Sequence, residues 1–258
     1  MSLLRHGLAA VLLAAAATQV AAAPTPATVL VDELTWTELR DAIKAGKTTV
    51  IVPVGGTEQS GPHIALGKHN VRARALAARI AASLGNALVA PVIAYVPEGA
   101  IDPPVGHMRF AGTISIPQSA FEATLEGAAR SFRQAGFRDI VLIGDHGGYQ
   151  TSLAKVAAKL DREWAASAVR VHAISEYYLA AERDFAQALR RQGFSEAEIG
   201  THAGVADTSL SLAVDEQLVR SALLHDGRAG TTRIAGRVGI DLIVARTRDA
   251  IQREVARR

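Results

Sequence analysis

The run Thr48-Thr49-Val50-Ile51-Val52-Pro53-Val54 leads directly into Gly55-Gly56-Thr57-Glu58-Gln59-Ser60-Gly61-Pro62-His63. Its first half is short, apolar and rich in β-branched residues, as buried strands are, and its second half is rich in glycine and polar side chains. Strands buried on both faces are typical of parallel sheets, and ligands bind at the carboxyl ends of such strands. This stretch therefore predicts both the fold and the place of a site.

The same alternation continues along the chain. Strands are predicted at residues 48–54, 87–93, 140–143 and 169–174, and helices at 70–84, 118–134, 151–165, 175–192, 208–218 and 236–256. Strands that alternate with helices predict an α/β fold, with a mainly parallel sheet flanked by helices. Because no internal repeat or low-complexity linker interrupts residues 24–258, we predict one layered α/β domain over this range.

Residues 1–23 have the pattern of a secretory signal peptide. Arg5 and His6 precede an apolar stretch at residues 8–17, and small residues precede Pro24. The stretch is too short to cross a bilayer comfortably, although an uncleaved anchor is the alternative. We therefore expect a periplasmic or secreted protein without membrane association after cleavage.

Composition narrows the class of protein. The 258 residues are 49% hydrophobic and 21% charged, which suits a globular domain with a sizeable core. The formal net charge of +3 is spread along the chain and only 5% of residues are aromatic, so a nucleic-acid surface is not expected. With no cysteine, any metal ion must be held by His, Asp and Glu.

Histidines and acids gather at the ends of two predicted strands. Glu58 follows the first strand, His69 begins the next helix, and Asp145 and His146 follow the strand at 140–143. Glu58, His69 and His146 supply the three N and O donors that a divalent ion needs. Alternatively, the three residues bind no metal and have structural roles: Glu58 caps a loop, His69 begins a helix, and His146 is a hydrogen-bonded histidine in a Gly-rich turn. The glycines around His146 also suit a phosphate cradle, but the lysine of a P-loop is missing.

Four blocks of sequence, taken together and in order, resemble the creatininase (creatinine amidohydrolase) family. They are Pro53 to His63, His107-Met108-Arg109-Phe110-Ala111-Gly112-Thr113-Ile114-Ser115, Gly144-Asp145-His146-Gly147-Gly148 and His202-Ala203-Gly204-Val205-Ala206-Asp207-Thr208-Ser209. The resemblance implies a metal-dependent hydrolase of C–N bonds, typically with two divalent ions, that acts on a small-molecule amide. It also implies a layered α/β fold that often forms hexamers, so a homo-oligomer is expected.

The resemblance assigns roles to the histidines and acids residue by residue. Glu58 and His63 match the first and last residues of the family's Glu-Gln-His-Gly-Pro-His motif, and His146 matches its Asn-Gly-His block. His202 matches the histidine assigned to catalysis, which is expected to move a proton to the departing nitrogen. Asp207 is expected to orient His202 or, alternatively, to cap the helix that begins near Thr208.

Departures from the family pattern concern the second ion. Ser60 replaces a histidine ligand, His69 replaces the bridging aspartate, and Gly148 stands where creatininase has a carboxylate. An imidazole nitrogen binds one ion and cannot bridge two, so we predict a mononuclear centre of Glu58, His69 and His146 holding Zn, Mn or Fe. A second ion on His63 and Asp207 is the alternative. Substrate-binding or supporting roles are predicted for His63, His107, Ser60, Asp145 and Gly147.

The residues near the predicted site make creatinine itself a doubtful substrate. Gly147, Glu198 and Ile199 stand where creatininase has aromatic and acidic residues that contact the ring. Another cyclic amide, a lactam or a small formamide is the expected substrate. Two other functions remain open: a non-catalytic, exported metal- or ligand-binding descendant, and a serine hydrolase using Ser60 with a histidine and Asp145. The serine alternative lacks the Gly-x-Ser-x-Gly motif.

Overall fold

The computed structural model describes residues 27–224 and 229–257, so the predicted signal peptide at residues 1–23 lies outside the described residues. The strands are β1 (Thr49–Val54), β2 (Ala87–Val89), β3 (Asp139–Gly144) and β4 (Arg170–Ala173). The helices are α1 (Trp36–Lys44), α2 (Lys68–Leu84), α3 (Gln118–Ala135), α4 (Gln150–Glu163), α5 (Glu176–Leu179), α6 (Phe185–Arg191), α7 (Glu196–Ile199), α8 (Val205–Val214) and α9 (Ala229–Ala256). None of these described helices combines the length and the apolar character that a bilayer crossing requires.

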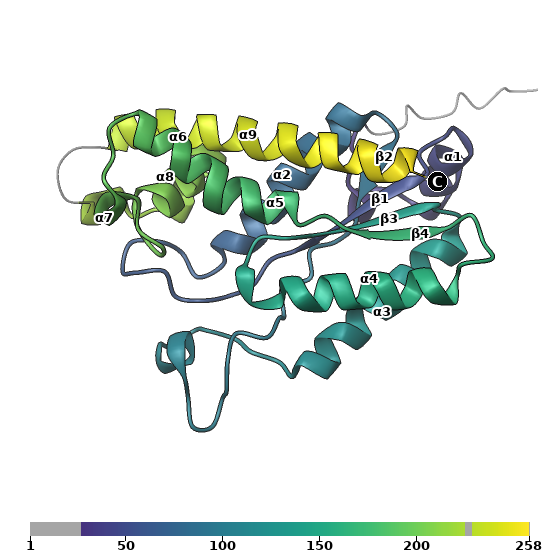
Figure 1. The fold of residues 1–258 in the computed structure, drawn as a ribbon, viewed down its shortest axis with the longest axis horizontal. Coiled ribbons are helices and arrows are strands. Elements are labelled where there is room, and N and C mark those ends of the chain that lie inside the picture. The colour runs from purple at the N-terminus through teal and green to yellow at the C-terminus, as the bar shows by residue number, and fades with distance from the viewer. Residues whose placement is uncertain (1–26, 225–228, 258) are drawn as a thin grey trace, which may run out of the picture.

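The four strands form one parallel sheet in the order β2-β1-β3-β4. In the central pair, Val54 at the end of β1 lies opposite Gly144 at the end of β3. The segments that follow β1 and β3 therefore leave the sheet at the same edge. The predicted α/β fold with a parallel sheet flanked by helices is confirmed (Figure 1).

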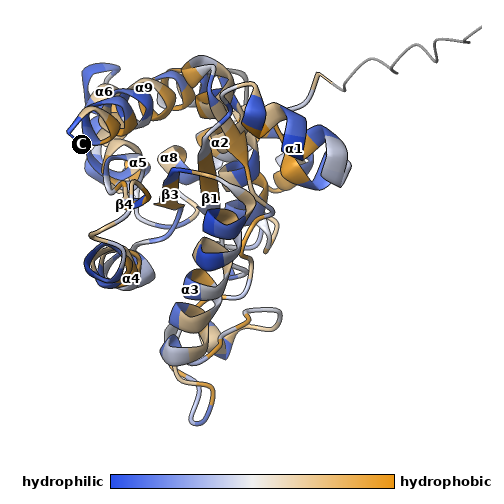
Figure 2. Ribbon diagram, turned by 90° about the vertical axis from the view of Figure 1, so that its right-hand side faces the viewer, coloured by the Kyte–Doolittle hydropathy of each residue, from blue (hydrophilic) through white to orange (hydrophobic). Residues whose placement is uncertain are grey.

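Helices cover both faces of the sheet, and alternate residues of each strand enter different cores. Ile51, Val141 and Ile143 pack in a core with residues of α2, α5, α6, α8 and α9. Val50, Val52 and Leu142 pack in the opposite core with residues of α3 and α4. Figures 1 and 2 show these two layers, with β1 and β3 strongly hydrophobic between them.

Several boundaries differ from the prediction for local reasons. β2 ends at Val89, shortly before Pro91, which has no N–H to donate to the ladder. The predicted helix at 175–192 is divided by a π-helical turn at Ala180–Asp184, and the helix at 208–218 is shifted to Val205–Val214. Helix α1 was not predicted, although Thr35 and Glu38 form a capping box at its start.

A long irregular segment, residues 90–117, connects β2 to α3 and includes a short 3-10 turn at Gly106–Arg109. It lies against the loop after β1, because the N–H of Ile114 donates to the carbonyl of Thr57 (3.0 Å). The hydroxyl of Ser115 accepts hydrogen bonds from the N–H groups of Glu98 (3.0 Å) and Gly99 (3.2 Å). These contacts hold residues of the segment beside the edge where β1 and β3 end.

Candidate metal centre

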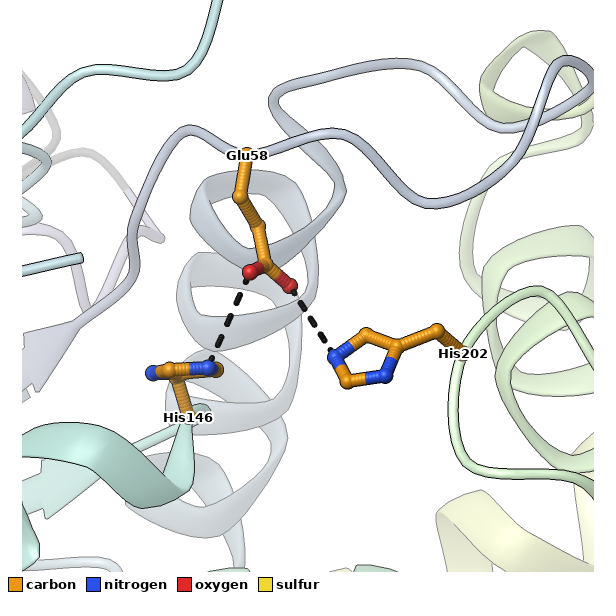
Figure 3. A group of neighbouring side chains, drawn as sticks. All are labelled: Glu58, His146 and His202. Atoms are coloured by element: carbon orange, nitrogen blue, oxygen red, sulfur yellow. Dashed lines mark ion pairs between the residues drawn. The ribbon is translucent and has the colours of Figure 1, made fainter. Parts of the chain in front are cut away.

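Glu58 lies at the centre of a cluster of histidines where β1 and β3 end. Its loop is fixed because its N–H donates to the carbonyl of Leu66 (3.1 Å) and the N–H of Gly56 donates to Asn70 Oδ1 (3.0 Å). The Glu58 side chain is fully buried. Figure 3 shows its carboxylate between His146, which follows β3, and His202, which precedes α8.

The distances within this group suit a metal ion. Nε2 of His146 is 3.7 Å from Oε2 of Glu58, and Nε2 of His202 is 3.8 Å from Oε1 (Figure 3). The three residues each offer one ligand atom within 4.8 Å of the others. Oε2 of Glu58 is buried and accepts no hydrogen bond from any described residue. A buried carboxylate oxygen without a donor is costly, and a cation at this position would satisfy it.

The charges of the group also suit a metal ion. Burial alone would raise the pKa of Glu58, but the hydrogen bond from His69 and the neighbouring positive groups outweigh burial and lower it to about 2. Burial lowers the pKa of His146 to about 4, and it also lowers the pKa of His202. At neutral pH the group therefore offers an anionic carboxylate and two neutral imidazoles, the forms that bind metal ions.

His69, the second residue of α2, lies between two carboxylates. Its Nδ1 is 2.6 Å from Oδ2 of Asp145, and its Nε2 is 2.9 Å from Oε1 of Glu58. Histidines that bind metal ions commonly donate their other ring N–H to a carboxylate, as His69 can to Asp145. The Nε2 lone pair and the Glu58 oxygen then face each other, and a proton or a metal ion must lie between them.

Behind this cluster lies a network of buried ions that the sequence analysis missed. Arg72 donates to Asp145 Oδ2 (2.6 Å) and to Asp207 Oδ1 (2.6 Å), and Lys68 Nζ lies 2.5 Å from Asp207 Oδ2. Burial alone would raise the pKa of Asp207, but the charges of Arg72 and Lys68 outweigh it and hold the pKa well below its ordinary value. The sequence does carry a signal, because Lys68 and Arg72 share the buried helix stripe of Leu76.

Asp207 contacts the backbone beside His202. Its Oδ2 accepts a hydrogen bond from the N–H of Ala203 (3.2 Å), and Ala203 has a left-handed φ of 56°. Among the described contacts, none joins Asp207 to the His202 ring. In this structure Asp207 therefore fixes the turn that carries His202.

The other predicted supporting residues lie around the cluster. Nε2 of His63 is 3.1 Å from the hydroxyl of Thr208, at the start of α8. His107 donates from Nδ1 to the carbonyl of Gln59 (2.9 Å), and its ring centroid is 4.6 Å from that of His202. Gly147 leaves room for Tyr178, whose hydroxyl oxygen would be 2.5 Å from a Cβ at position 147.

Ser60 is fully buried and has polar contacts different from those of a catalytic serine. Its hydroxyl contacts Lys68 Nζ and donates to Asp207 Oδ2 (3.1 Å). Within the described residues no histidine contacts Ser60, and Asp145 interacts with His69, Arg72 and Tyr177 instead. These contacts do not support the serine-hydrolase alternative.

Glu98 is a further acid at the site, in the same irregular segment as His107. Its side chain is 1% exposed, and Oε2 lies 3.8 Å from Nδ1 of His146. Neither of its carboxylate oxygens has a hydrogen-bond partner among the described residues. Burial, together with the charge of Glu58, raises the pKa of Glu98 to about 8.

This raised pKa predicts how the stability of the metal-free protein depends on pH. The folded chain keeps the Glu98 proton up to about pH 8, whereas the unfolded chain loses it near 4.5, so stability is lost as pH rises through this window. In the chelated protein, Glu98→Gln should remove this loss. The variant's unfolding free energy should gain about 2 kcal/mol relative to wild type between pH 5 and pH 8. Denaturant titrations at several pH values measure the difference, and parallel profiles for the two proteins would contradict the prediction.

A cavity of about 280 Å³ opens beside the cluster. Its lining includes His69, His146 and His202 together with Tyr178, Glu182 and Ile199. The His202 side chain is 40% exposed, so His202 can meet a molecule in the cavity. The cavity is large enough for a small substrate and brings that substrate to the candidate metal ligands.

Comparison with known proteins agrees with this geometry. A family model named creatininase, described as creatinine amidohydrolase, matches residues 32–254. The chain belongs to the creatininase family. Creatinine amidohydrolase from Pseudomonas putida is 30% identical over 196 residues, which cover 74% of each protein. The resemblance carried by the four sequence blocks is thereby confirmed.

Two other relatives show the range of the creatininase family. A mycofactocin precursor peptide peptidase from Mycolicibacterium smegmatis is 38% identical over 119 residues, which cover 44% of this chain and 45% of that protein. The solved structure of a creatininase point mutant, described as a zinc–zinc type, has a TM-score of 0.70 and 26% identity, and the match covers 88% of this chain and 98% of the other. This chain is accordingly a metal-dependent hydrolase of the creatininase type, acting on C–N bonds.

Proposed function

We propose that the chain is an exported amidohydrolase that uses one divalent metal ion to cleave a C–N bond in a small cyclic amide or related amide. The observation that carries this proposal is the buried Oε2 of Glu58, which accepts no hydrogen bond from a described residue and lies 3.7 Å from Nε2 of His146, a residue that lines the 280 Å³ cavity. The proposed ligands are Glu58, His69 and His146. Two histidines and one carboxylate suit Zn, Mn or Fe.

The ionic network favours one ion over two. Asp145 and Asp207, the other buried acids near the cluster, already form ion pairs with Arg72, and Asp207 also pairs with Lys68. His63, proposed as an alternative ligand of a second ion, has its Nε2 beside the hydroxyl of Thr208. Among these three acids, Glu58 is therefore the one that keeps a carboxylate oxygen without a hydrogen bond from a described residue.

The chain's own residues then have distinct roles in the reaction. When bound, a divalent ion polarises an amide carbonyl and lowers the pKa of a water ligand to about 7 in favourable sites. Asp145 holds the ring of His69 through Nδ1, and Asp207 holds the turn of His202 through the N–H of Ala203. His202 is partly exposed, faces the cavity and has its pKa lowered by burial, so it can carry a proton to the departing nitrogen.

The cavity lining and the relatives guide the choice of substrates. The P. putida relative is a creatinine amidohydrolase, and the M. smegmatis relative is a precursor peptide peptidase. Gly147 and Tyr178 shape the wall beside His146 in this chain, so we propose an amide other than creatinine. Export by the segment at residues 1–23 and assembly into a homo-oligomer complete the proposal.

The test is metal-dependent hydrolysis by the mature chain. The protein is stripped with a chelator, reconstituted with Zn²⁺, Mn²⁺ or Fe²⁺, and assayed for amine release from lactams, cyclic imides, N-formyl amines and short peptides. Chelation should lower the rate about a hundredfold or more, and one of the ions should restore it. A protein that binds one ion per chain and hydrolyses none of these amides would instead favour the non-catalytic, exported binding protein.

A further inference from the structure

Lys68 is a buried cation that points into the metal centre. It is the first residue of α2, and 2% of its surface is exposed. Its Nζ contacts the hydroxyl of Ser60, lies 2.5 Å from Oδ2 of Asp207, and lies 3.7 Å from Oε1 of Glu58. Three oxygen atoms, two from the loop after β1 and one from α8, thus converge on one ammonium group.

This set of oxygens is chemically a cation site. Carboxylate and hydroxyl oxygens are ligands for hard divalent ions, and an ammonium group is a compact cation that can satisfy the same oxygens. Buried charges persist only when they are paired, and a cation at this position pairs with Glu58 and, beside its contact with Arg72, with Asp207. The lysine supplies it without a metal ion.

The charge balance of the network is consistent with a single ion. Among the groups joined by ion pairs, three buried carboxylates (Glu58, Asp145 and Asp207) face two buried cations, Lys68 and Arg72, so these five groups carry one net negative charge. One divalent ion makes the centre mildly positive. A second divalent ion beside Lys68 would concentrate positive charge in a poorly solvated site, where like charges repel strongly.

We propose that the Lys68 ammonium group takes the place of a second divalent cation, so that the site formed by Ser60, Asp207 and one oxygen of Glu58 is filled by the protein's own side chain. The inference rests on the proposed function in one respect, that Glu58 also binds the catalytic ion. It explains how this chain, with its proposed one-ion centre, can share a fold with a creatininase described as a zinc–zinc type.

The experiment measures zinc stoichiometry. Wild type, Lys68→Ala and the surface control Lys155→Ala are saturated with Zn²⁺, dialysed, and analysed for zinc per chain by elemental analysis. Lys155 of α4 is exposed and pairs with Glu122 of α3, and among the described contacts it touches none of the metal-centre residues. Wild type and Lys155→Ala should hold one ion, and Lys68→Ala should hold two.

A double variant locates the second ion. Adding Ser60→Ala to Lys68→Ala should weaken binding of the second ion by about tenfold or more, because one of its oxygen ligands is removed. Unchanged affinity in the double variant would overturn the proposal, since the ion would then lie elsewhere. Two ions in wild type, or one ion in Lys68→Ala, would overturn it as well.

Folding is a further readout. Lys68→Ala leaves Asp207 and Glu58 short of a cation, so Zn²⁺ should raise its melting temperature more than that of Lys155→Ala. A Lys68→Ala chain that remains unfolded in Zn²⁺ would also contradict the proposal. None of these measurements requires the enzyme to turn over a substrate. If wild type binds no ion, the proposed function is refuted. If wild type and Lys68→Ala each bind one ion, only this inference is refuted.

Discussion

Glu58→Gln should lower kcat/KM of the zinc- or manganese-loaded enzyme by about a thousandfold or more, equivalent to about 4 kcal/mol of lost transition-state stabilisation. Glu58 is the fully buried acid that His69, His146 and His202 surround. An amide at this position keeps the shape but removes the negative charge that the ion requires. Bound metal should therefore fall together with activity, as measured by elemental analysis of the same preparations.

The matched control is Glu126→Gln. Glu126 lies on α3, where its carboxylate pairs with Lys159 in an exposed ion pair. Exposed pairs contribute little to stability, so metal content and kcat/KM should stay close to those of wild type. A Glu58→Gln protein that retains one ion and more than about a tenth of the activity would rule out Glu58 as the central ligand.

Asp207→Ala should lower the unfolding free energy by about 3–5 kcal/mol, because it removes the shared partner of two buried cations. Arg72 Nη1 and Lys68 Nζ lie 2.6 Å and 2.5 Å from its two oxygens. The substitution also releases the N–H of Ala203, so the turn that carries His202 should loosen. Chemical denaturation of the metal-free variant measures the loss of stability.

Asp41→Ala is the control for this loss, since Asp41 pairs with Arg40 on the surface of α1. Removing an exposed pair should change the unfolding free energy by less than about 1 kcal/mol. A loss below about 1 kcal/mol in Asp207→Ala as well would show that the buried network contributes little to stability.

The positions of Glu58 and His146 could be predicted because strands determine them. β1 and β3 are apolar runs that end in Gly-rich segments, and parallel neighbours bring those ends to one edge. The other two strands, β2 and β4, were predicted from the same kind of short apolar run. The family resemblance then drew attention to His202, although only the turn held by Asp207 brings this histidine to Glu58.

Other parts of the site follow from tertiary contacts that no sequence period encodes. Glu98 and His107 lie in the irregular segment 90–117, which reaches the loop of Glu58 through hydrogen bonds to Thr57 and Gln59. Lys68 and Arg72 are different, since their spacing places them on the buried stripe of α2. Charged residues on such a stripe indicate buried acids opposite them, and the sequence does not identify which acids these are.

The most direct measurement of the metal centre is an anomalous-scattering map from crystals grown with Zn²⁺. One peak per chain is expected, about 2.0–2.2 Å from an oxygen of Glu58 and from ring nitrogens of His69 and His146. Lys68 Nζ should remain in contact with Asp207 in the same crystal. Two peaks around Glu58, or no peak at Glu58 with zinc bound elsewhere, would contradict a single-ion centre built on this carboxylate.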